Sequence, residues 1–379
     1  MTTSLDDRRQ RHDHAMQQAF AWPAGAPWIR AAIAATSRDQ YTPDRIWTLE
    51  GDQFVPIDRG RDPERWASLV YASPETSTIT QVADSVTTSN LIATAVVADM
   101  LDHLDLEPGH RVLELGTGTG WLTALMTRRT GANRVITLEI DPELATGTRE
   151  RLHHHGVHAR VENTDGLAGW PAGAPYDRVV ATFEPRGIPW AWGEQTRPGG
   201  LIVSPWRRGL VPLIVDDEGI SASGRVQQAT QFIPARDTLP AARAMPRTWQ
   251  QIRSRTNTAH QQRVIDRDLT QLQRSEHLLW ALSVLLPDVW VLAHTTIRGL
   301  VVTLHDGDAS WALLNAPPTG GPSVAFEGGP RRLADELEEA WDAWLSVGSP
   351  TIYSFGVTVT AGRQWAWQDN PTNGPWDPR

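Results

Sequence analysis

The chain of 379 residues has no cysteine and no lysine, and it has no apolar run long enough to cross a membrane. The missing cysteine excludes disulfides, thiolate metal sites and cysteine nucleophiles. The missing lysine excludes Schiff-base catalysis on a lysine amine. The formal net charge of −9 argues against a nucleic-acid partner bound through its phosphates. Without an 18-residue apolar stretch or a signal-peptide pattern, we expect a cytoplasmic protein with no membrane partner.

The most informative stretch is residues 111–126, where an apolar run ends in a glycine-rich turn at Gly116, Gly118 and Gly120. The residues before the turn predict a buried strand, and the amphipathic residues after it predict the start of a helix. The glycines let a ligand lie directly on the backbone because no Cβ intrudes. The helix N-terminus then offers unpaired N–H groups and a partial positive charge.

Glu139 ends the next apolar run, residues 134–138, about 20 residues beyond the glycine turn. At that position a nucleoside-binding α/β unit places a carboxylate that accepts the ribose hydroxyls. The glycine spacing is G-x-G-x-G, whereas dinucleotide enzymes usually have G-x-G-x-x-G. No basic residue follows Glu139 to hold a 2′-phosphate. The pattern therefore favours one nucleoside without a pyrophosphate.

Strand-like and helix-like segments alternate through this half of the chain. Further short apolar runs occur at residues 159–162, 174–182 and 195–206. Such alternation predicts a parallel sheet that is covered on both faces by helices.

The whole series resembles the S-adenosylmethionine-dependent methyltransferases with a Rossmann-like fold. GTGTG is similar to their first motif, Glu139 to the second, Asp165-Gly166 to the adenine-side motif, and residues 174–182 to the fourth. The resemblance implies S-adenosylmethionine as the cofactor. The cofactor-binding residues that it implies are Glu114, Gly116, Thr117, Gly118, Gly120, Trp121, Glu139, Ile140, Asp165, Gly166 and Thr182. For Trp121, packing of the helix start is an alternative role.

The resemblance narrows to the protein-L-isoaspartate O-methyltransferase family. Residues 164–182, TDGLAGWPAGAPYDRVVAT, are similar to a family pattern in which G-D-G and W-P or Y-P precede A-P-[FY]-D, with Thr164 in place of the first Gly. Residues 37–47 resemble its P-R-x-x-F-x-P segment. Residues 51–72 are similar to homologues that accompany ribosomally made modified peptides, namely graspetides, lasso peptides and lanthipeptides. That branch methylates an Asp side chain of a precursor peptide, and the ester then closes to an aspartimide, which can hydrolyse to isoaspartate.

Thr87, Thr88 and Ser89 are the candidate catalytic residues. The family has a hydroxyl-rich segment followed by Pro before the helix that leads to the first strand, and this chain has the hydroxyls without the Pro. A carboxylate nucleophile is already ionised near neutral pH, so hydroxyls need only orient it. In the alternative interpretation, these residues are N-caps of a helix that begins near Asn90. Both roles are compatible.

Phe183, Glu184 and Arg186 follow the fourth strand at its carboxyl end, the usual ligand side of an open α/β sheet. They are candidate peptide contacts, with a solvated loop as the alternative. The histidine-rich residues 153–158 have no carboxylate or cysteine partner at ligand spacing, so we expect no metal.

We divide the chain into a lead-in segment (1–80), a methyltransferase core (81–226) and a C-terminal α+β accessory domain (227–379). In the second half, residues 210–226 predict a hairpin, residues 260–286 have helical spacing, and residues 334–345 predict an amphipathic helix with Trp341 and Trp344 in the core. Residues 227 to about 255 are irregular and rich in Pro and Arg, so we expect a connecting segment there. Short strands are expected at residues 289–293, 300–304, 311–314, 324–326, 352–360 and 364–368.

Three functions follow. The leading prediction is an O-methyltransferase that esterifies an Asp carboxylate of a modified precursor peptide, acts as a monomer and recognises the peptide through the accessory domain. The second is general L-isoaspartate repair, which the long extension disfavours because we expect a repair enzyme to end soon after the core. The third is a non-catalytic peptide-binding scaffold with a vestigial cofactor fold, which the intact motifs disfavour.

Overall fold

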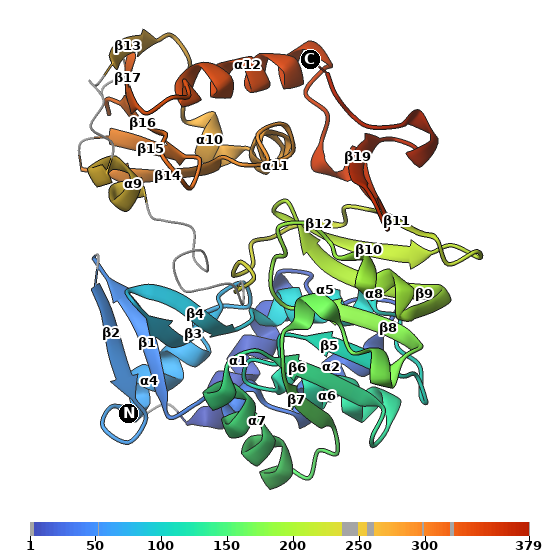
Figure 1. Ribbon diagram of the computed structural model, residues 1–379. Helices are drawn as coiled ribbons and strands as arrows, with labels where there is room; N and C mark the ends of the chain where they lie inside the picture. Colours follow the sequence, from blue (N-terminus) through green and yellow to red (C-terminus); the bar gives the residue numbers. More distant parts are fainter. Residues whose placement is uncertain are drawn as a thin grey trace.

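The computed structural model describes residues 4–51, 53–236, 249–255, 261–297, 299–318 and 322–378. These residues form a four-stranded, a ten-stranded and a five-stranded sheet with helices packed around them (Figure 1). In Figure 1 the five-stranded sheet, in orange, lies above the blue and green elements of the other two sheets. Within the described residues, no helix is long and apolar enough to span a membrane.

The N-terminal part packs helices against a small antiparallel sheet of order β2-β1-β3-β4. Ser4 and Asp7 form a capping box that starts the first helix, because each side chain accepts the other's backbone N–H. The elements are α1 (Leu5–Gln18), α2 (Pro27–Ala35), α3 (Arg38–Tyr41), β1 (Arg45–Glu50), β2 (Gln53–Asp58), α4 (Pro63–Val70), β3 (Thr78–Ala83) and β4 (Val86–Leu91). After strand β4, the chain continues into the elements that form the central, ten-stranded sheet.

The central sheet confirms the predicted α/β core. Parallel strands lie in the order β9-β8-β5-β6-β7. Because β6 and β7 lie on one side of β5, and β8 and β9 on the other, the boundary between β5 and β8 is a topological switch point. The elements are α5 (Thr94–His103), β5 (Val112–Leu115), α6 (Trp121–Thr130), β6 (Val135–Glu139), α7 (Pro142–His154), β7 (Arg160–Asn163), η1 (Gly166–Ala168), η2 (Pro171–Gly173), β8 (Tyr176–Ala181), α8 (Trp190–Glu194) and β9 (Thr196–Trp206).

Alternate residues of the parallel strands face two separate apolar layers. In β5, Leu113 and Leu115 belong to one buried cluster, and Val112 belongs to the other, which also contains Leu125 of α6. All four side chains are fully buried. Both faces of the sheet are therefore covered, as the continuous apolar runs predicted.

The end of the chain returns to the central sheet. Strands β10 (Gly209–Val215) and β11 (Ser221–Arg225) form the predicted hairpin, and β12 (Gln228–Ala229) pairs with β10. Beside β11, the sheet adds β18 (Phe355–Thr360) and β19 (Gln364–Gln368), with 3-10 turns η3 (Ile352–Ser354) and η4 (Pro371–Asn373). The last two strands thus extend the core sheet, although the linear division assigns them to the accessory domain.

The accessory module is a five-stranded antiparallel sheet of order β13-β17-β16-β15-β14 with helices packed on it. The predicted strands and the helix with buried Trp341 and Trp344 are confirmed. The Trp280 ring lies 6.2 Å from Trp206 and 4.4 Å from Phe355, which joins the module to the core. The elements are α9 (Trp249–Arg255), β13 (Gln261–Ile265), α10 (Gln271–Arg274), α11 (Glu276–Leu285), β14 (Trp290–Thr296), β15 (Gly299–His305), β16 (Trp311–Ala316), β17 (Ser323–Gly328) and α12 (Leu333–Ser346).

Two local predictions were wrong. The helix expected from Asn90 begins at Thr94, because residues 86–91 pair with β3 as strand β4. The helical spacing of residues 260–286 continues only through α10 and α11, because residues 261–265 pair with β17. In both places long-range strand pairing overrides the local pattern. Part of the connector predicted around residues 227–255 lies outside the described residues.

Candidate active site

The glycine turn joins β5 to α6 in the predicted strand–turn–helix arrangement. Gly116, Gly118 and Gly120 have φ angles of 91°, 53° and 83°, a region that side chains disfavour. A Cβ at Gly116 would come within 2.5 Å of Thr182 Oγ1, and one at Gly120 within 2.7 Å of a Thr148 methyl group. Backbone conformation favours glycine at all three positions, and close packing also requires it at Gly116 and Gly120.

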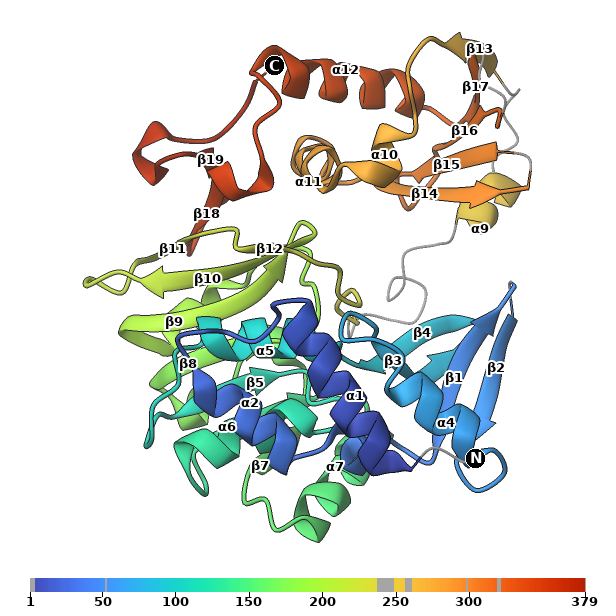
Figure 2. The ribbon, with the colours of Figure 1, turned by 180° about the vertical axis from the view of Figure 1, so that it is seen from behind.

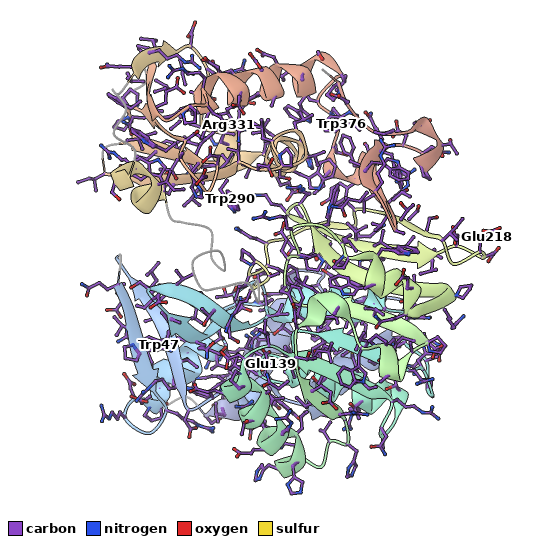
Figure 3. The ribbon with its side chains drawn as sticks, viewed as in Figure 1. Trp47, Glu139, Glu218, Trp290, Arg331 and Trp376 are labelled. Atoms are coloured by element: carbon purple, nitrogen blue, oxygen red, sulfur yellow. The ribbon has the colours of Figure 1, made fainter. Side chains whose placement is uncertain are left out.

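A cleft at the carboxyl ends of β5, β6 and β8 gathers most of the predicted cofactor residues. Figure 3 shows Glu139 near the centre of the lower body, within this region. Gly120 is the member of the predicted set that does not line the cleft; it packs against α7. The predicted residues in its lining are Glu114, Gly116, Thr117, Gly118, Trp121, Glu139, Ile140, Asp165, Gly166 and Thr182.

Glu139 is held in place by backbone N–H groups at the end of β6. Gly118 N–H donates to Oε2 at 2.8 Å, and Asp141 N–H donates to Oε1 at 3.0 Å. Burial raises the pKa of Glu139, and these two hydrogen bonds act in the opposite direction. The carboxylate is thereby oriented on the cleft wall, where its remaining lone pairs suit the ribose hydroxyls of a nucleoside.

Glu114 in β5 supplies a second buried carboxyl group in the cleft wall. Its Oε2 accepts the Thr123 hydroxyl, whereas its buried Oε1 has no hydrogen-bond partner in the described part of the chain. Burial raises the pKa of Glu114 to about 8. An unpaired carboxyl oxygen in such a wall fits a cationic ligand group, such as the ammonium of the methionine part of S-adenosylmethionine.

Asp165 and Gly166 line the cleft after β7. Asp165 Oδ1 accepts the Leu167 N–H at 2.9 Å and so starts the short helix η1. A Cβ at Gly166 would lie 3.3 Å from the Phe183 ring. The glycine therefore lets Phe183 pack closely against the cleft floor.

The hydroxyl residues lie on strand β4, and Ser89 among them lies next to the glycine turn. A Cβ at Gly118 would lie 3.8 Å from Ser89 Oγ. Ser89 Oγ accepts a hydrogen bond from Thr80 at 3.0 Å, and Thr88 donates to Gln81 Oε1 at 2.8 Å. The Ser89 hydroxyl hydrogen is therefore free to be donated to an acceptor in the cleft, whereas the Thr88 hydroxyl hydrogen is already donated to Gln81.

Thr87, the third predicted hydroxyl residue, is half-buried on β4 and is not part of the cleft lining. The N-cap interpretation of residues 87–89 is wrong, because Ala93 occupies the N-cap position of α5.

Trp121 combines both of its proposed roles. It is buried at the helix start, where its Nε1 donates to the Thr36 carbonyl at 2.7 Å, and it also lines the cleft.

Arg236 is a cleft residue that the sequence analysis missed. It is the last of residues 233–236, which line the cleft. Two backbone hydrogen bonds hold this segment to Glu184: the Glu184 N–H donates to the Ile233 carbonyl, and the Ala235 N–H donates to the Glu184 carbonyl, each at 2.8 Å. Its guanidinium contacts Asp141 Oδ2 and Gln81 Oε1, each at 2.9 Å, and the Thr88 carbonyl. The surrounding sequence is irregular, so no periodic signal distinguished this arginine.

Of the three predicted peptide contacts, Phe183 reaches the cleft. Glu184 is directed to the β9–β10 turn, where burial raises its pKa and the backbone N–H groups of Arg208 and Arg207 act in the opposite direction. Arg186 is exposed outside the cleft lining. Within the described ranges, no cluster of three or more His, Asp or Glu side chains is arranged to hold a metal ion.

A protein-family model and several known proteins are similar to this chain. Residues 57–239 match the model of "Protein-L-isoaspartate(D-aspartate) O-methyltransferase (PCMT)". A protein-L-isoaspartate O-methyltransferase 1 from Anaeromyxobacter sp. (strain Fw109-5) is 36% identical over 217 residues, 55% of this chain and 86% of that protein. The chain belongs to the protein-L-isoaspartate O-methyltransferase family. It is therefore an S-adenosylmethionine-dependent carboxyl O-methyltransferase, and S-adenosylmethionine is its cofactor.

Other relatives match over a shorter part of their length. The protein-L-isoaspartate O-methyltransferase of Anaeromyxobacter dehalogenans (strain 2CP-1) is 44% identical over 114 residues, 29% of this chain and 53% of that protein. A solved structure named protein-L-isoaspartate O-methyltransferase has a TM-score of 0.53 and 16% identity, and covers 96% of this chain and 100% of its own. The shared fold therefore extends beyond the core.

Proposed function

We propose that this enzyme methylates an aspartyl-type carboxylate in a peptide chain, with an L-isoaspartyl residue as the substrate best supported. The observation that carries the proposal is the placement of the Ser89 hydroxyl and the Arg236 guanidinium on the β4 side of a cleft built for S-adenosylmethionine. The cofactor supplies a methyl group on a sulfonium, which a carboxylate oxygen attacks.

The protein's part in this reaction is to hold the carboxylate. Ser89 donates its free hydroxyl hydrogen to one carboxylate oxygen, and the Arg236 guanidinium, which is paired with Asp141, lies on the same wall as a further donor. Asp141 and Gln81 fix the guanidinium, so it cannot swing into the methyl path. A carboxylate is ionised at neutral pH, so no general base is needed. One O–C bond forms as one S–C bond breaks, and no proton moves.

The cleft also has to exclude water from the reacting atoms. Phe183 and Ile233 come from segments that are hydrogen-bonded to each other, and both residues line the cleft together with Trp121. Apolar walls of this kind favour in-line contact between a desolvated carboxylate and the methyl carbon. Alignment and desolvation are the main contributions that methyl transfer requires.

The names of the matched family and of its relatives support an L-isoaspartyl substrate. The test uses mass spectrometry on two synthetic peptides of one sequence that differ only in an L-isoaspartyl or an ordinary aspartyl residue. With S-adenosylmethionine, we expect the isoaspartyl peptide to gain one methyl group and the aspartyl peptide to remain unmodified. Methylation of neither peptide would contradict the repair assignment.

A second candidate function is the tailoring of a dedicated, ribosomally made precursor peptide. Residues 51–72, which form β2 and α4, resemble homologues that act in such systems. Strand β14 pairs with β15 alone among the described strands, so its other edge can pair with an extended peptide. In this function the methyl ester on an Asp side chain loses methanol to a backbone amide.

The two functions are separated by one further peptide. The precursor peptide encoded nearest the gene, after its cyclising enzyme has acted, is incubated with the enzyme and S-adenosylmethionine. A transient gain of one methyl group followed by a net loss of one water would support tailoring and locate the aspartate. Methylation confined to the isoaspartyl peptide would support repair.

A further inference from the structure

A second cavity lies behind the cofactor cleft, between α1, α2 and the start of α5. Its volume is about 300 Å³, and Trp121 contributes to the walls of both this cavity and the cofactor cleft. Figure 2 shows α1, α2 and α5 on one side of the central sheet. The proposed methyl transfer uses none of the cavity's other residues.

Arg38 brings a buried positive charge to this cavity. It is 2% exposed, and its guanidinium donates to the hydroxyls of Thr94 at 2.6 Å and Thr78 at 3.3 Å. The Trp121 ring centre lies 5.5 Å from its central carbon. Among the described residues, no carboxylate lies within 4 Å of Arg38. Its charge therefore has only neutral partners, an arrangement that is costly unless an anion is bound.

The other arginines of the cavity wall are already paired. Arg9 contacts Asp39 at 2.8 Å, and Arg30 contacts Asp13 at 2.6 Å. Arg9 also contacts the exposed Asp6 at 2.7 Å. Among the described residues, Arg38 is therefore the arginine of the cavity wall that has no carboxylate partner.

Three polar atoms of the cavity residues are buried and have no partner in the described structure: Arg38 Nε, His12 Nδ1 and Trp22 Nε1. Arginine and tryptophan nitrogens are donors only. His12 Nε2 lies 2.8 Å from Thr94 Oγ1, which already accepts from Arg38; in the tautomer in which the threonine donates to Nε2, the imidazole proton lies on Nδ1. Burial lowers the pKa of His12 to about 4, so the ring is neutral. All three atoms thus lack an acceptor.

The remaining walls are largely apolar. Trp22, Ile33 and Trp121 line the cavity, and Ala34 lies at its exposed rim. A cavity of about 150 Å³ holds benzene in other proteins, so about 300 Å³ is ample for one ring with a short substituent. Apolar walls next to a charged donor favour an organic anion over an inorganic one.

We propose that this cavity binds a small organic monocarboxylate with an apolar body. The carboxylate lies on the Arg38 side of the cavity, and the apolar body fills the space beside Trp121. This site is separate from the methyl-transfer cleft and does not depend on the substrate proposed above.

The test is calorimetric titration with phenylacetate of the full chain saturated with S-adenosylhomocysteine, with phenylacetamide as the uncharged isostere. We expect one phenylacetate per chain, and about tenfold or weaker binding of the amide, because the charge-assisted bonds are lost. Phosphate and chloride serve as inorganic probes. Absence of phenylacetate binding, equal binding of the amide, or tighter binding of phosphate or chloride would overturn the proposal.

Variants locate the site. Arg38→Met removes the positive charge of Arg38 from the cavity wall. Ala34→Trp fills the rim of the cavity and leaves Arg38 in place. The second variant keeps the test valid if Arg38→Met does not fold. Ala31→Trp is the matched control, because Ala31 is exposed on the same helix and is not part of the cavity lining. We expect Ala34→Trp to weaken phenylacetate binding about tenfold or more and Ala31→Trp to leave it unchanged. Unchanged binding in Ala34→Trp would place the ligand elsewhere and refute the proposal.

Discussion

The guanidinium of Arg236 lies 2.9 Å from the carboxylate of Asp141, although the two residues are 95 positions apart in the chain. Asp141 caps helix α7 and donates its own N–H to Glu139. The ion pair therefore connects the segment that crosses the cleft with the loop that orients the ribose-binding carboxylate.

Replacement of Arg236 tests the carboxylate-binding side of the cleft. In Arg236→Gln we expect kcat/KM for the peptide substrate to fall about 10- to 100-fold, because one hydrogen bond to a charged group contributes about 1.5–3 kcal/mol. Steady-state kinetics measure this effect, and titration with S-adenosylhomocysteine reports any loss at Glu139. Arg186→Gln is the matched control because Arg186 is exposed outside the cleft. Equal loss in both variants would argue against a specific role for Arg236.

Ser89→Ala removes the hydroxyl that is free to donate into the cleft. We expect kcat to fall about tenfold, which corresponds to about 1.4 kcal/mol of transition-state stabilisation, with little change in S-adenosylhomocysteine affinity. Thr88→Val is expected to reduce kcat less, because the Thr88 hydrogen is already bonded to Gln81. A larger effect from Thr88→Val would transfer the orienting role to Thr88. Single-turnover methylation separates this step from product release.

Glu139→Gln tests the cofactor assignment. The change removes the charge that receives the Gly118 and Asp141 N–H groups, so we expect affinity for S-adenosylhomocysteine to fall at least about tenfold. Glu143→Gln in the first turn of α7 is the control, since Glu143 is exposed and outside the cleft lining. Calorimetric titration gives both values. Retained affinity in Glu139→Gln would contradict the ribose-binding role.

Gly116→Ala is expected to disrupt the glycine turn. Its Cβ would lie 2.5 Å from Thr182 Oγ1, and its φ of 91° already disfavours a side chain. Gly131→Ala is the control, because Gly131 has φ of 105° and open space around its Cβ position. This variant carries the backbone strain alone, which lowers the free energy of unfolding by about 1–2 kcal/mol. We expect Gly116→Ala to unfold at a lower temperature than Gly131→Ala and to lose cofactor affinity. Thermal unfolding of both variants, with and without S-adenosylhomocysteine, makes the comparison.

Glu114 makes the stability of the cofactor-free enzyme depend on pH. Its pKa is raised from 4.5 in a model carboxyl group to about 8 by burial, so between these values the folded state binds one proton more than the unfolded state. The free energy of unfolding therefore decreases as pH rises from about 4.5 to about 8. Denaturant unfolding at several pH values should show this decrease in the wild type and a smaller one in Glu114→Gln. The same slope in both would exclude Glu114 as its source.

The glycine turn, Glu139 and Asp165-Gly166 could be identified before the fold was known. Each lies where a buried apolar run ends, and parallel strands bring their carboxyl ends to one edge of the sheet. The local pattern of these residues therefore also determines that they meet. The hydroxyls of β4 were identified through family resemblance, but their strand conformation was not, because pairing with β3 overrides the expected helix start.

Only the tertiary structure brought Arg236 to Asp141, β18 to β11, and Arg38 to His12. These pairs are separated by long stretches of chain, and no periodicity of the intervening residues records which elements will pack together. What the sequence by itself determined was the local conformation and chemistry of the cofactor turn. The closure of the cleft by Arg236 and the second cavity beside Trp121 depend on long-range side-chain packing, which only the assembled fold decides.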